Sequence, residues 1–375
     1  MSENNGFSRR EFLNMVGKGA VGAAGLHVLG IPGFQKAFAE ALAHVPVVWM
    51  QAGSCSGCSV SLLNAVSPTI QDVLLDEVVP GQHLSLAFHP TVMAGQGHGA
   101  MSVVEKYKKN GGPFVLVLEG SISTKDDGIY CEVGEKDGHG ITMYQHLLDL
   151  APKAMAVINI GSCSSYGGIP MADPNPTGVK PVGTILQEHS IKTPVVNVPG
   201  CPPHPDWFIG TVATVLLGGL DALAVDQYGR PKAFYSGKIH DNCQYRGQYD
   251  QGILARDFGE EGCLYALGCR GPSSSADCPH RKWNNAVSWC IGSGSPCIGC
   301  VEPGFPFEKS LLVQLDRDAP SPGDVPPIVS QRNSGTVAGI TGVAGLAAGA
   351  AAGVGLANSR KGNGEKKDAE TETES

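Results

Sequence analysis

The chain of 375 residues contains twelve cysteines, and the residues around them suggest metal chemistry. Cys55 and Cys58 form a C-x-x-C pair, whereas Cys163 and Cys201 stand singly in glycine-containing segments. Iron–sulfur clusters are held by cysteine thiolates in local pairs that distant residues complete, and neighbouring glycines let backbone N–H groups approach the cluster sulfurs. Taken alone, a C-x-x-C pair fits a zinc or redox site equally well.

Most of the other cysteines lie between Gly237 and Phe307, a region of short segments rich in Gly, Pro and Ser. They are Cys243, Cys263, Cys269, Cys278, Cys290, Cys297 and Cys300. His240 comes shortly before the first of them and is either a further ligand or an ordinary surface histidine. Because a region with few long apolar runs cannot fill a core by side chains alone, we expect bound clusters to organise it.

The N-terminus indicates where these cysteines acquire their partners. Arg9 and Arg10 lie in a twin-arginine pattern, a weakly apolar stretch follows at Val16–Ile31, and small residues suited to cleavage come next. We interpret residues 1–43 as a Tat-type signal peptide; the alternative is an amphipathic helix with a chance arginine pair. Tat substrates fold and acquire cofactors in the reducing cytoplasm, which favours metal ligands over disulfides.

The segment that follows alternates short apolar runs with helical stretches, which is typical of a parallel sheet wrapped by helices. The expected strands are Val45–Met50, Leu84–Phe88, Phe114–Leu118, Ala156–Ile160 and Val195–Val198. The expected helices include Ser59–Leu75, Met101–Lys109 and Met143–Leu150. In such sheets ligand sites gather beyond the carboxyl ends of the strands, and the single cysteines and the C-x-x-C pair all follow strands.

Composition and the C-terminus limit the possible functions further. The chain is 42% apolar and carries a net charge of −8, which excludes a disordered chain and argues against a nucleic-acid partner. Residues 316–333 are predicted to form a Pro-rich linker and residues 334–359, which lack any charge, a transmembrane anchor. The alternative for the latter is a flexible Ala/Gly tail. Residues 360–375 are predicted to be a charged cytoplasmic tail.

Taken jointly, the motifs resemble the small subunit of nickel-iron hydrogenases over nearly the whole chain after the signal. The resemblance is carried by Cys55-Ser56-Gly57-Cys58-Ser59-Val60-Ser61-Leu62-Leu63-Asn64, Glu119-Gly120-Ser121-Ile122, Gly128-Ile129-Tyr130-Cys131, Gly161-Ser162-Cys163, Pro199-Gly200-Cys201-Pro202-Pro203 and Pro296-Cys297-Ile298-Gly299-Cys300-Val301-Glu302-Pro303. It implies an α/β fold in which a flavodoxin-like domain, residues 44–236, is followed by a loop-rich iron–sulfur domain, residues 237–315.

The resemblance also implies three iron–sulfur clusters in a line. The proximal four-iron cluster would be bound by Cys55, Cys58, Cys163 and Cys201. The distal four-iron cluster would be bound by His240, Cys243, Cys263 and Cys269. The medial cluster would be bound by Cys278, Cys290, Cys297 and Cys300.

Several positions depart from the commoner family pattern. Many members have proline where Cys290 stands and hold a three-iron medial cluster, so Cys290 favours four irons and resembles the nickel-iron-selenium branch; the alternative is a buried thiol. Val60 also resembles that branch. Gly57 and Gly168 occupy the places of two extra cysteines in oxygen-tolerant members, so a six-cysteine proximal cluster is not expected. Cys131 is left over and is expected to be a buried thiol.

The expected function is therefore electron transfer in a periplasmic, membrane-bound, uptake-type hydrogenase. The reaction, H2 ⇌ 2 H+ + 2 e−, would take place on a nickel-iron centre in a large-subunit partner. The acceptor would be a membrane cytochrome b, a quinone-reactive membrane protein or a c-type cytochrome. The alternatives are an iron–sulfur carrier for another exported oxidoreductase and a zinc- or disulfide-stabilised binding protein.

Overall fold

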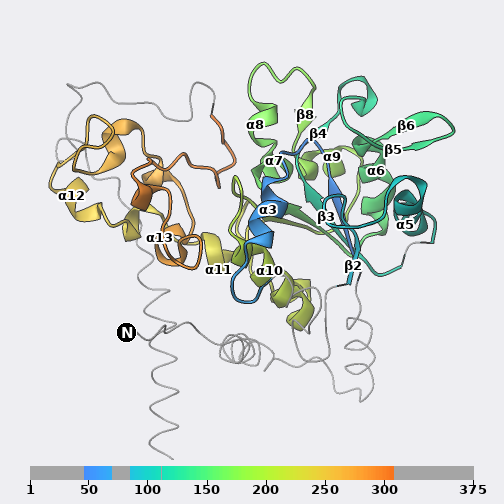
Figure 1. The fold of residues 1–375 in the computed structure, drawn as a ribbon, viewed down its shortest axis with the longest axis horizontal. Coiled ribbons are helices and arrows are strands. Elements are labelled where there is room, and N and C mark those ends of the chain that lie inside the picture. Colours follow the sequence, from blue (N-terminus) through green and yellow to red (C-terminus); the bar gives the residue numbers. More distant parts are fainter. Residues whose placement is uncertain (1–45, 70–84, 111, 308–375) are drawn as a thin grey trace, which may run out of the picture. The chain divides into compact units, whose positions relative to one another are not determined.

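The computed structural model describes residues 46–69, 85–110 and 112–307 (Figure 1). The predicted signal peptide, linker, membrane anchor and charged tail lie outside these residues. Among the helices that are described, none combines the length and the apolar character needed to cross a membrane. The described residues all fall within one compact unit.

A five-stranded parallel sheet forms the centre of the N-terminal part (Figure 1). Its strands are β1 (Pro46–Gln51), β2 (Ser85–Phe88), β3 (Val115–Glu119), β7 (Ala156–Ile160) and β9 (Val195–Val198). Each agrees with an expected strand to within one residue at the ends that the structure describes. Their order in the sheet is β2-β1-β3-β7-β9, which is the order of flavodoxin-like sheets. The prediction of a parallel α/β sheet is confirmed.

Helices cover both faces of this sheet. Successive side chains along a strand point to opposite faces, so strands that are buried throughout need cover on both sides. On one face, Val48 and Met50 of β1 pack with side chains from α5 (Gly97–Asn110), α6 (Met143–Leu150) and α9 (Val182–Glu188). On the opposite face, Val47 and Trp49 pack with side chains from α3 (Gly57–Leu63) and α10 (Pro205–Gly218). Because both faces are covered, the strands read as nearly continuous apolar runs.

The remaining elements are short. Two small antiparallel sheets pair β4 (Ile122–Ser123) with β8 (Val179–Lys180) and β5 (Glu132–Lys136) with β6 (His139–Thr142). The other α-helices are α7 (Ser162–Tyr166), α8 (Gly168–Met171), α11 (Lys232–Tyr235), α12 (Arg246–Asp250) and α13 (Cys278–Arg281). Single 3-10 turns occur at Lys125–Gly128, Ala151–Lys153, Leu220–Ala222, His240–Asn242, Leu264–Leu267, Gly271–Ser273 and Ile291–Ser293.

The sequence predicted α6 at its observed bounds, and the Thr142 hydroxyl caps it by accepting a hydrogen bond from the Gln145 amide at 3.1 Å. The helix expected over Ser59–Leu75 was wrong in extent, because α3 ends at Leu63 and the chain turns before Pro68. Helix α10 was not among the predicted segments, although Pro205 at its first position and Gly219 after its last residue are recognisable boundary signals.

The cysteine-rich region, residues 237–307, contributes to the same hydrophobic core as the sheet. Its buried apolar side chains include Ile239, Leu264, Trp289 and Val301, which belong to one cluster with Trp207 of α10. Part of the region is therefore anchored by ordinary hydrophobic packing against the α/β part. The expectation that bound clusters organise the rest of this region stays a prediction.

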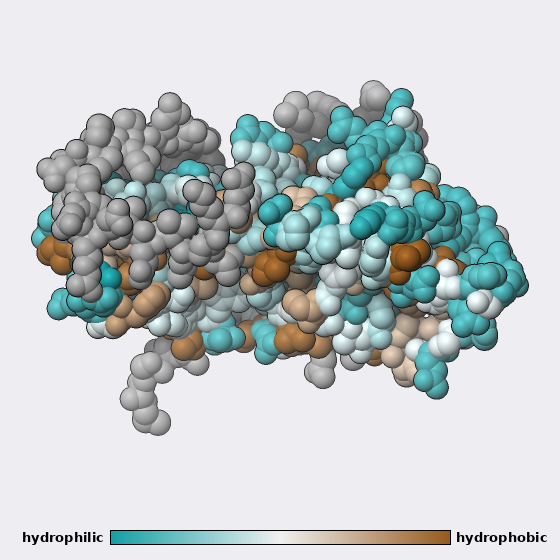
Figure 2. Space-filling model, turned by 90° about the horizontal axis from the view of Figure 1, so that it is seen from above, coloured by the Kyte–Doolittle hydropathy of each residue, from teal (hydrophilic) through white to brown (hydrophobic). Residues whose placement is uncertain are grey.

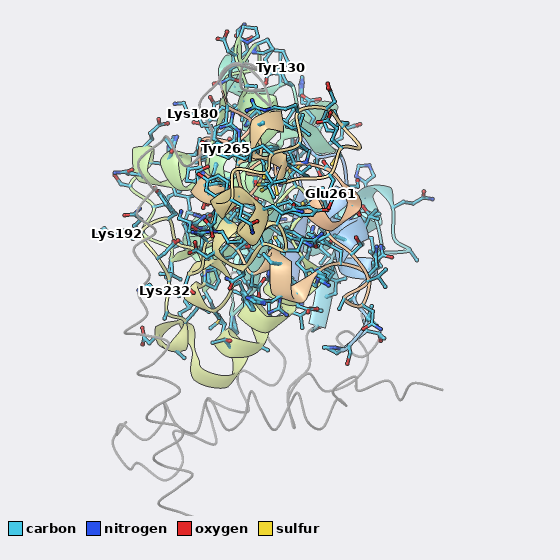
Figure 3. The ribbon with its side chains drawn as sticks, turned by 90° about the vertical axis from the view of Figure 1, so that its left-hand side faces the viewer. Tyr130, Lys180, Lys192, Lys232, Glu261 and Tyr265 are labelled. Atoms are coloured by element: carbon cyan, nitrogen blue, oxygen red, sulfur yellow. The ribbon has the colours of Figure 1, made fainter. Side chains whose placement is uncertain are left out.

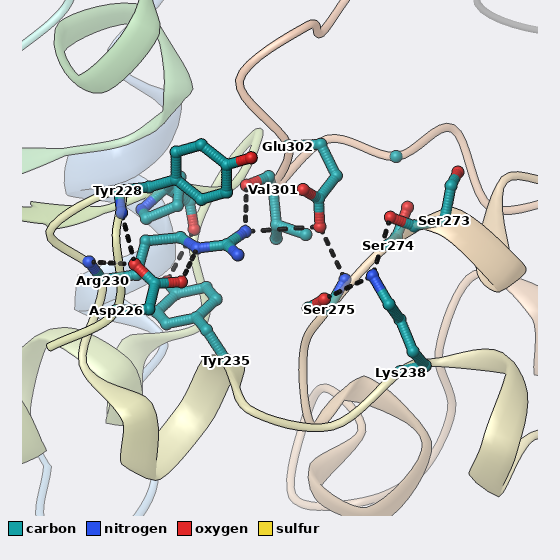
Figure 4. A network of polar contacts seen from close by, with 12 residues as sticks. Asp226, Tyr228, Arg230, Tyr235, Lys238, Ser273, Ser274, Ser275, Val301 and Glu302 are labelled. Carbon is teal, nitrogen blue, oxygen red and sulfur yellow. Dashed lines mark hydrogen bonds and ion pairs between the residues drawn. The ribbon is translucent and has the colours of Figure 1, made fainter. Parts of the chain in front are cut away.

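A buried ionic network also joins the two parts (Figure 4). The Arg230 guanidinium donates to Asp226 at 2.7 Å, to the Val301 carbonyl at 3.1 Å and to Glu302 at 3.3 Å. Glu302 in turn accepts a hydrogen bond from the Ser275 amide at 2.6 Å. The Arg230 side chain is only 4% exposed, so this arginine holds the segment after Cys300 against the α/β part.

Candidate metal centres

The first group of cysteines lies where three parallel strands end. Cys55 and Cys58 follow β1, Cys163 follows β7 and Cys201 follows β9, so the sheet places the three loops at one edge. Burial raises the pKa of the Cys58 thiol, and the nearby charges of Glu119, Cys163, Cys55 and Cys201 raise it further. The structure thus brings all four sequence-predicted proximal residues together.

Glycine is required beside this group. Gly161 has φ of +90°, and a Cβ built on it would lie 2.5 Å from the Cys58 sulfur. A side chain at Gly57 would approach the Cys55 sulfur to 3.1 Å, and one at Gly168 would approach the Cys163 sulfur to 3.0 Å. The two positions at which oxygen-tolerant members carry extra cysteines therefore border this site directly.

The second group of residues lines a single cavity in the cysteine-rich region. Its walls include all four predicted distal residues, His240, Cys243, Cys263 and Cys269, and it is partly open to solvent. Tyr265 also lines it, and this residue is labelled in Figure 3, where the molecule is seen from the side of the cysteine-rich region.

The histidine in this cavity has a free ligand atom. The His240 Nε2 is buried and has no hydrogen-bond partner in the structure, which is costly for a polar atom. Tyr249 packs edge-on against the ring at 4.4 Å between centroids and fixes its orientation. Burial and the positive charge of Arg246 lower the pKa of His240, so the ring is held neutral, the form that binds metals. These features fit a metal ligand and not a surface histidine.

The third group also lies in the cysteine-rich region. Burial raises the pKa of the Cys278 thiol, and the charges of Cys300, Cys297, Asp277 and Cys290 raise it further. Cys290 is more exposed than the other three but lies close enough to affect both Cys278 and Cys300. The four predicted medial residues are therefore neighbours.

The three groups adjoin one another. The Cys297 amide donates to the Cys269 sulfur at 3.3 Å, which joins the third group to the second. Cys201 lies close enough to Cys300 to influence the pKa of its thiol, which places the first group beside the third. Further amides donate to sulfurs within single groups, including Gly299 to Cys297 at 3.4 Å. Such N–H···S contacts are what a thiolate-bound cluster needs from its surroundings.

None of the twelve cysteines forms a disulfide, and burial raises the pKa of most of them, for example that of Cys163 to about 11. A thiolate therefore forms in these groups only if a cation replaces the proton, as a bound metal does. In the described part of the chain, no three His, Cys, Asp or Glu side chains converge as one metal ion requires. A cluster does not need such convergence, because each iron takes its own ligand.

Comparison with known proteins agrees with this arrangement. Residues 235–313 match the family of C-terminal regions of NiFe/NiFeSe hydrogenase small subunits, and residues 55–215 match the NADH ubiquinone oxidoreductase, 20 Kd subunit. The chain is 44% identical to the small subunit of the periplasmic [NiFeSe] hydrogenase of Desulfomicrobium baculatum, over 81% of this chain and 97% of that protein. It is 37% identical to the small chain of the quinone-reactive Ni/Fe-hydrogenase of Wolinella succinogenes, over 84% and 87%.

The folds agree as well. The structure of the Desulfomicrobium baculatum [NiFeSe]-hydrogenase matches with a TM-score of 0.67 at 44% identity, covering 72% of this chain and 99% of the matched chain. The fold and the site thus define a redox subunit of the α/β, iron–sulfur type. The chain belongs to the small subunits of nickel-iron hydrogenases, and it is a subunit of an oxidoreductase.

Two features of the site were not expected from the sequence. Glu119, noted only as part of a motif, is fully buried beside the Cys55–Cys58 turn. The Ser162 hydroxyl donates to the Cys300 carbonyl and accepts from the Gly200 amide at 3.0 Å, which ties the loop of Cys201 to that of Cys300. Cys131 lies apart, packed against the opposite face of the sheet, and it is half-buried where a buried thiol was expected.

Proposed function

We propose that the chain is the electron-transfer subunit of a periplasmic nickel-iron hydrogenase and relays electrons through three iron–sulfur clusters. The three groups of four candidate ligand residues lie next to one another, and this observation carries the proposal. The bound clusters would supply one-electron redox chemistry. The large subunit would hold the nickel-iron centre where hydrogen is oxidised or protons are reduced.

The ligand assignment follows the three groups. Cys55, Cys58, Cys163 and Cys201 hold the proximal cluster. His240, Cys243, Cys263 and Cys269 hold the distal cluster. Cys278, Cys290, Cys297 and Cys300 hold the medial cluster, which has four irons because four cysteines are available.

The chain's own residues contribute position and electrostatics. The strand ends after β1, β7 and β9 fix the proximal ligands on a rigid sheet. The Cys297 amide donates to the Cys269 sulfur, and the Ser162 hydroxyl links the Gly200 amide to the Cys300 carbonyl, so these contacts hold neighbouring groups together. Electrons would pass from the proximal through the medial to the distal site, and leave near His240 toward a membrane cytochrome b, a quinone-reactive membrane protein or a c-type cytochrome.

The proposal keeps the expected organisation of the whole chain. Residues 1–43 direct export by the Tat pathway, residues 44–236 and 237–315 bind the clusters, and residues 334–359 anchor the complex at the periplasmic side of the membrane. The relatives named as periplasmic and quinone-reactive support this location. Truncation after Ser330 should release active hydrogenase from the membrane, and identical fractionation of truncated and full-length protein would exclude the anchor.

The electron-transfer role is tested with His240→Ala in the complex with the large subunit. Electron delivery to an external acceptor should slow, whereas H/D exchange at the large subunit should stay nearly unchanged, because only the exit site is damaged. Tyr245→Phe is a matched control, since Tyr245 lines the same cavity but supplies no ligand. Equal loss of both activities in His240→Ala would indicate a folding defect and contradict the assigned role.

A further inference from the structure

Glu119 is a buried carboxylate surrounded only by hydrogen-bond donors. It is the last residue of β3, and its side chain is fully buried. The Trp49 indole N–H donates to it at 2.9 Å and the Gln51 amide at 3.0 Å, both from the adjacent strand β1. Because every one of these partners gives a hydrogen, the carboxylate acts purely as an acceptor, which is the behaviour of the ionised form.

Three further donors come from the turn that carries Cys55 and Cys58. The Ser59 backbone amide donates to Glu119 at 3.1 Å, and the Ser54 hydroxyl donates at 3.3 Å. The Ser59 hydroxyl also donates to the same carboxylate. Glu119 thus binds the residue before Cys55 and the residue after Cys58, so it holds both ends of the turn.

The histidine behind this turn completes the network without adding a charge. The His89 Nδ1 accepts from the Thr91 amide at 3.2 Å, so in the neutral ring the hydrogen is on Nε2, which faces the Ser59 hydroxyl at 3.2 Å. Burial lowers the pKa of His89, although Glu119 opposes this effect. None of the donors to Glu119 is a cation, so its negative charge is spread by hydrogen bonds and not cancelled.

The charge lies close to the proximal ligands. The carboxylate accepts from the Ser59 amide, next to Cys58, at 3.1 Å and from the Ser54 hydroxyl, next to Cys55, at 3.3 Å. A negative charge this close to the turn disfavours an added electron on a cluster bound to Cys55 and Cys58. The effect is strong because the site is buried.

We propose that Glu119 is a positioning residue whose fixed negative charge holds the Cys55–Cys58 turn and lowers the reduction potential of the cluster bound there. This inference rests on the proposed function, since it requires the proximal cluster. It gives a role to a residue that the sequence marked only as part of a motif. It also explains why a carboxylate is buried at the carboxyl end of a central strand with no ion pair among its hydrogen-bond partners.

The test compares three variants in the complete complex with the large subunit. Glu119→Gln removes the charge, Glu119→Asp keeps the charge but changes the geometry, and Trp49→Phe removes one donor. The iron content of each is measured, and the proximal cluster is titrated with a redox mediator series and followed by EPR. The medial and distal clusters serve as internal controls.

Glu119→Gln should favour reduction of the proximal cluster at least tenfold, which is an upward shift of about 59 mV for one electron. Glu119→Asp should stay within about threefold of the wild type, which is about 28 mV and half of that tenfold shift. An unchanged potential in Glu119→Gln that still contains its iron would overturn this inference alone. The same upward shift in Glu119→Asp would also overturn it, since geometry would then be the cause.

Two other outcomes are decisive. If Glu119→Gln does not assemble, Trp49→Phe decides the question: its proximal potential should fall, because the carboxylate keeps its charge with one donor fewer, and an unchanged or raised potential would contradict the inference. If the wild-type complex itself contains no proximal cluster, both the inference and the proposed function fail.

Discussion

The α/β part and the cysteine-rich part of this chain achieve order in different ways. Strand β7 is buried at all five residues, and the sheet around it is filled on both faces by apolar side chains. Residues 237–307, by contrast, contain only 3-10 turns, short helices and isolated bridges such as Lys238–Ser275. The proximal ligands therefore follow strands of a sheet that apolar packing stabilises. The medial and distal ligands lie in loops with few regular elements around them.

The two parts of the chain do not differ in the same way at their surfaces. On the face seen in Figure 2, hydrophobic residues form separate patches among hydrophilic ones. Exposed apolar side chains occur in both parts, for example Val60 at 52% in α3 and Phe258 at 60% in the cysteine-rich region. The two parts thus differ in their interiors. We therefore expect them to respond differently to the loss of metal.

The largest effect is expected on removal of iron. In complex produced under iron limitation, residues 237–307 should lose most of their protection from amide hydrogen exchange, whereas strands β1, β3 and β7 should keep theirs. The reason is that metal binding supplies folding free energy where a core does not. Hydrogen exchange followed by mass spectrometry measures this, and equal protection of both parts with and without iron would show that the comparison is wrong.

A smaller effect is expected from breaking the ionic network between the parts. Arg230→Met leaves Asp226 and Glu302 buried without their cation, which typically costs about 3–5 kcal/mol. Both carboxylates are largely shielded, with side chains 19% and 14% exposed. Thermal unfolding should show the loss, with the cysteine-rich part melting first.

The matched control for this prediction is Lys180→Met. Lys180 and Glu188 form an ion pair whose side chains are 42% and 43% exposed, so its loss should change stability by less than about 1 kcal/mol. If Arg230→Met and Lys180→Met unfold alike, the network does not join the two parts.

The smallest expected effect comes from glycine. Gly161→Ala should lower the iron content of the proximal site without unfolding the sheet, because its Cβ would meet the Cys58 sulfur at 2.5 Å in a backbone conformation with φ of +90°. Gly183→Ala, in α9, meets nothing within 4 Å and should be neutral or stabilising by about 0.5–1 kcal/mol. Iron analysis and thermal unfolding of both variants check the pair, and a full proximal cluster in Gly161→Ala would contradict it.

The sequence predicted the strands well because burial on both faces leaves a clear apolar run, as in Ala156–Ile160. The three ligand groups were implied by the resemblance of the motifs to nickel-iron hydrogenase small subunits; the structure brings the members of each group together, and their role as ligands stays a prediction. The sequence did not reveal Glu119, because the donors to that carboxylate come from β1 and from the turn after it, which only the folded sheet brings together. The Arg230 network was missed for the same reason, since Glu302 is far from Arg230 in the sequence.

The sequence was a poor guide to the length of one helix. Ser59–Leu75 was expected to be one helical stretch, but α3 ends at Leu63. Local propensity is a weak guide when a turn must return the chain, and the residues around Pro68 make that turn.

The central claim is that this chain holds three four-iron clusters, with Cys290 as the fourth medial ligand. The most direct test is EPR spectroscopy and iron analysis of the oxidised, anaerobically purified complex, for the wild type and for Cys290→Pro. An oxidised three-iron cluster is paramagnetic, whereas an oxidised low-potential four-iron cluster is silent. The wild type should contain iron for three four-iron clusters and give no strong three-iron signal, and Cys290→Pro should give one. A full-intensity three-iron signal in the undamaged wild type would contradict the claim.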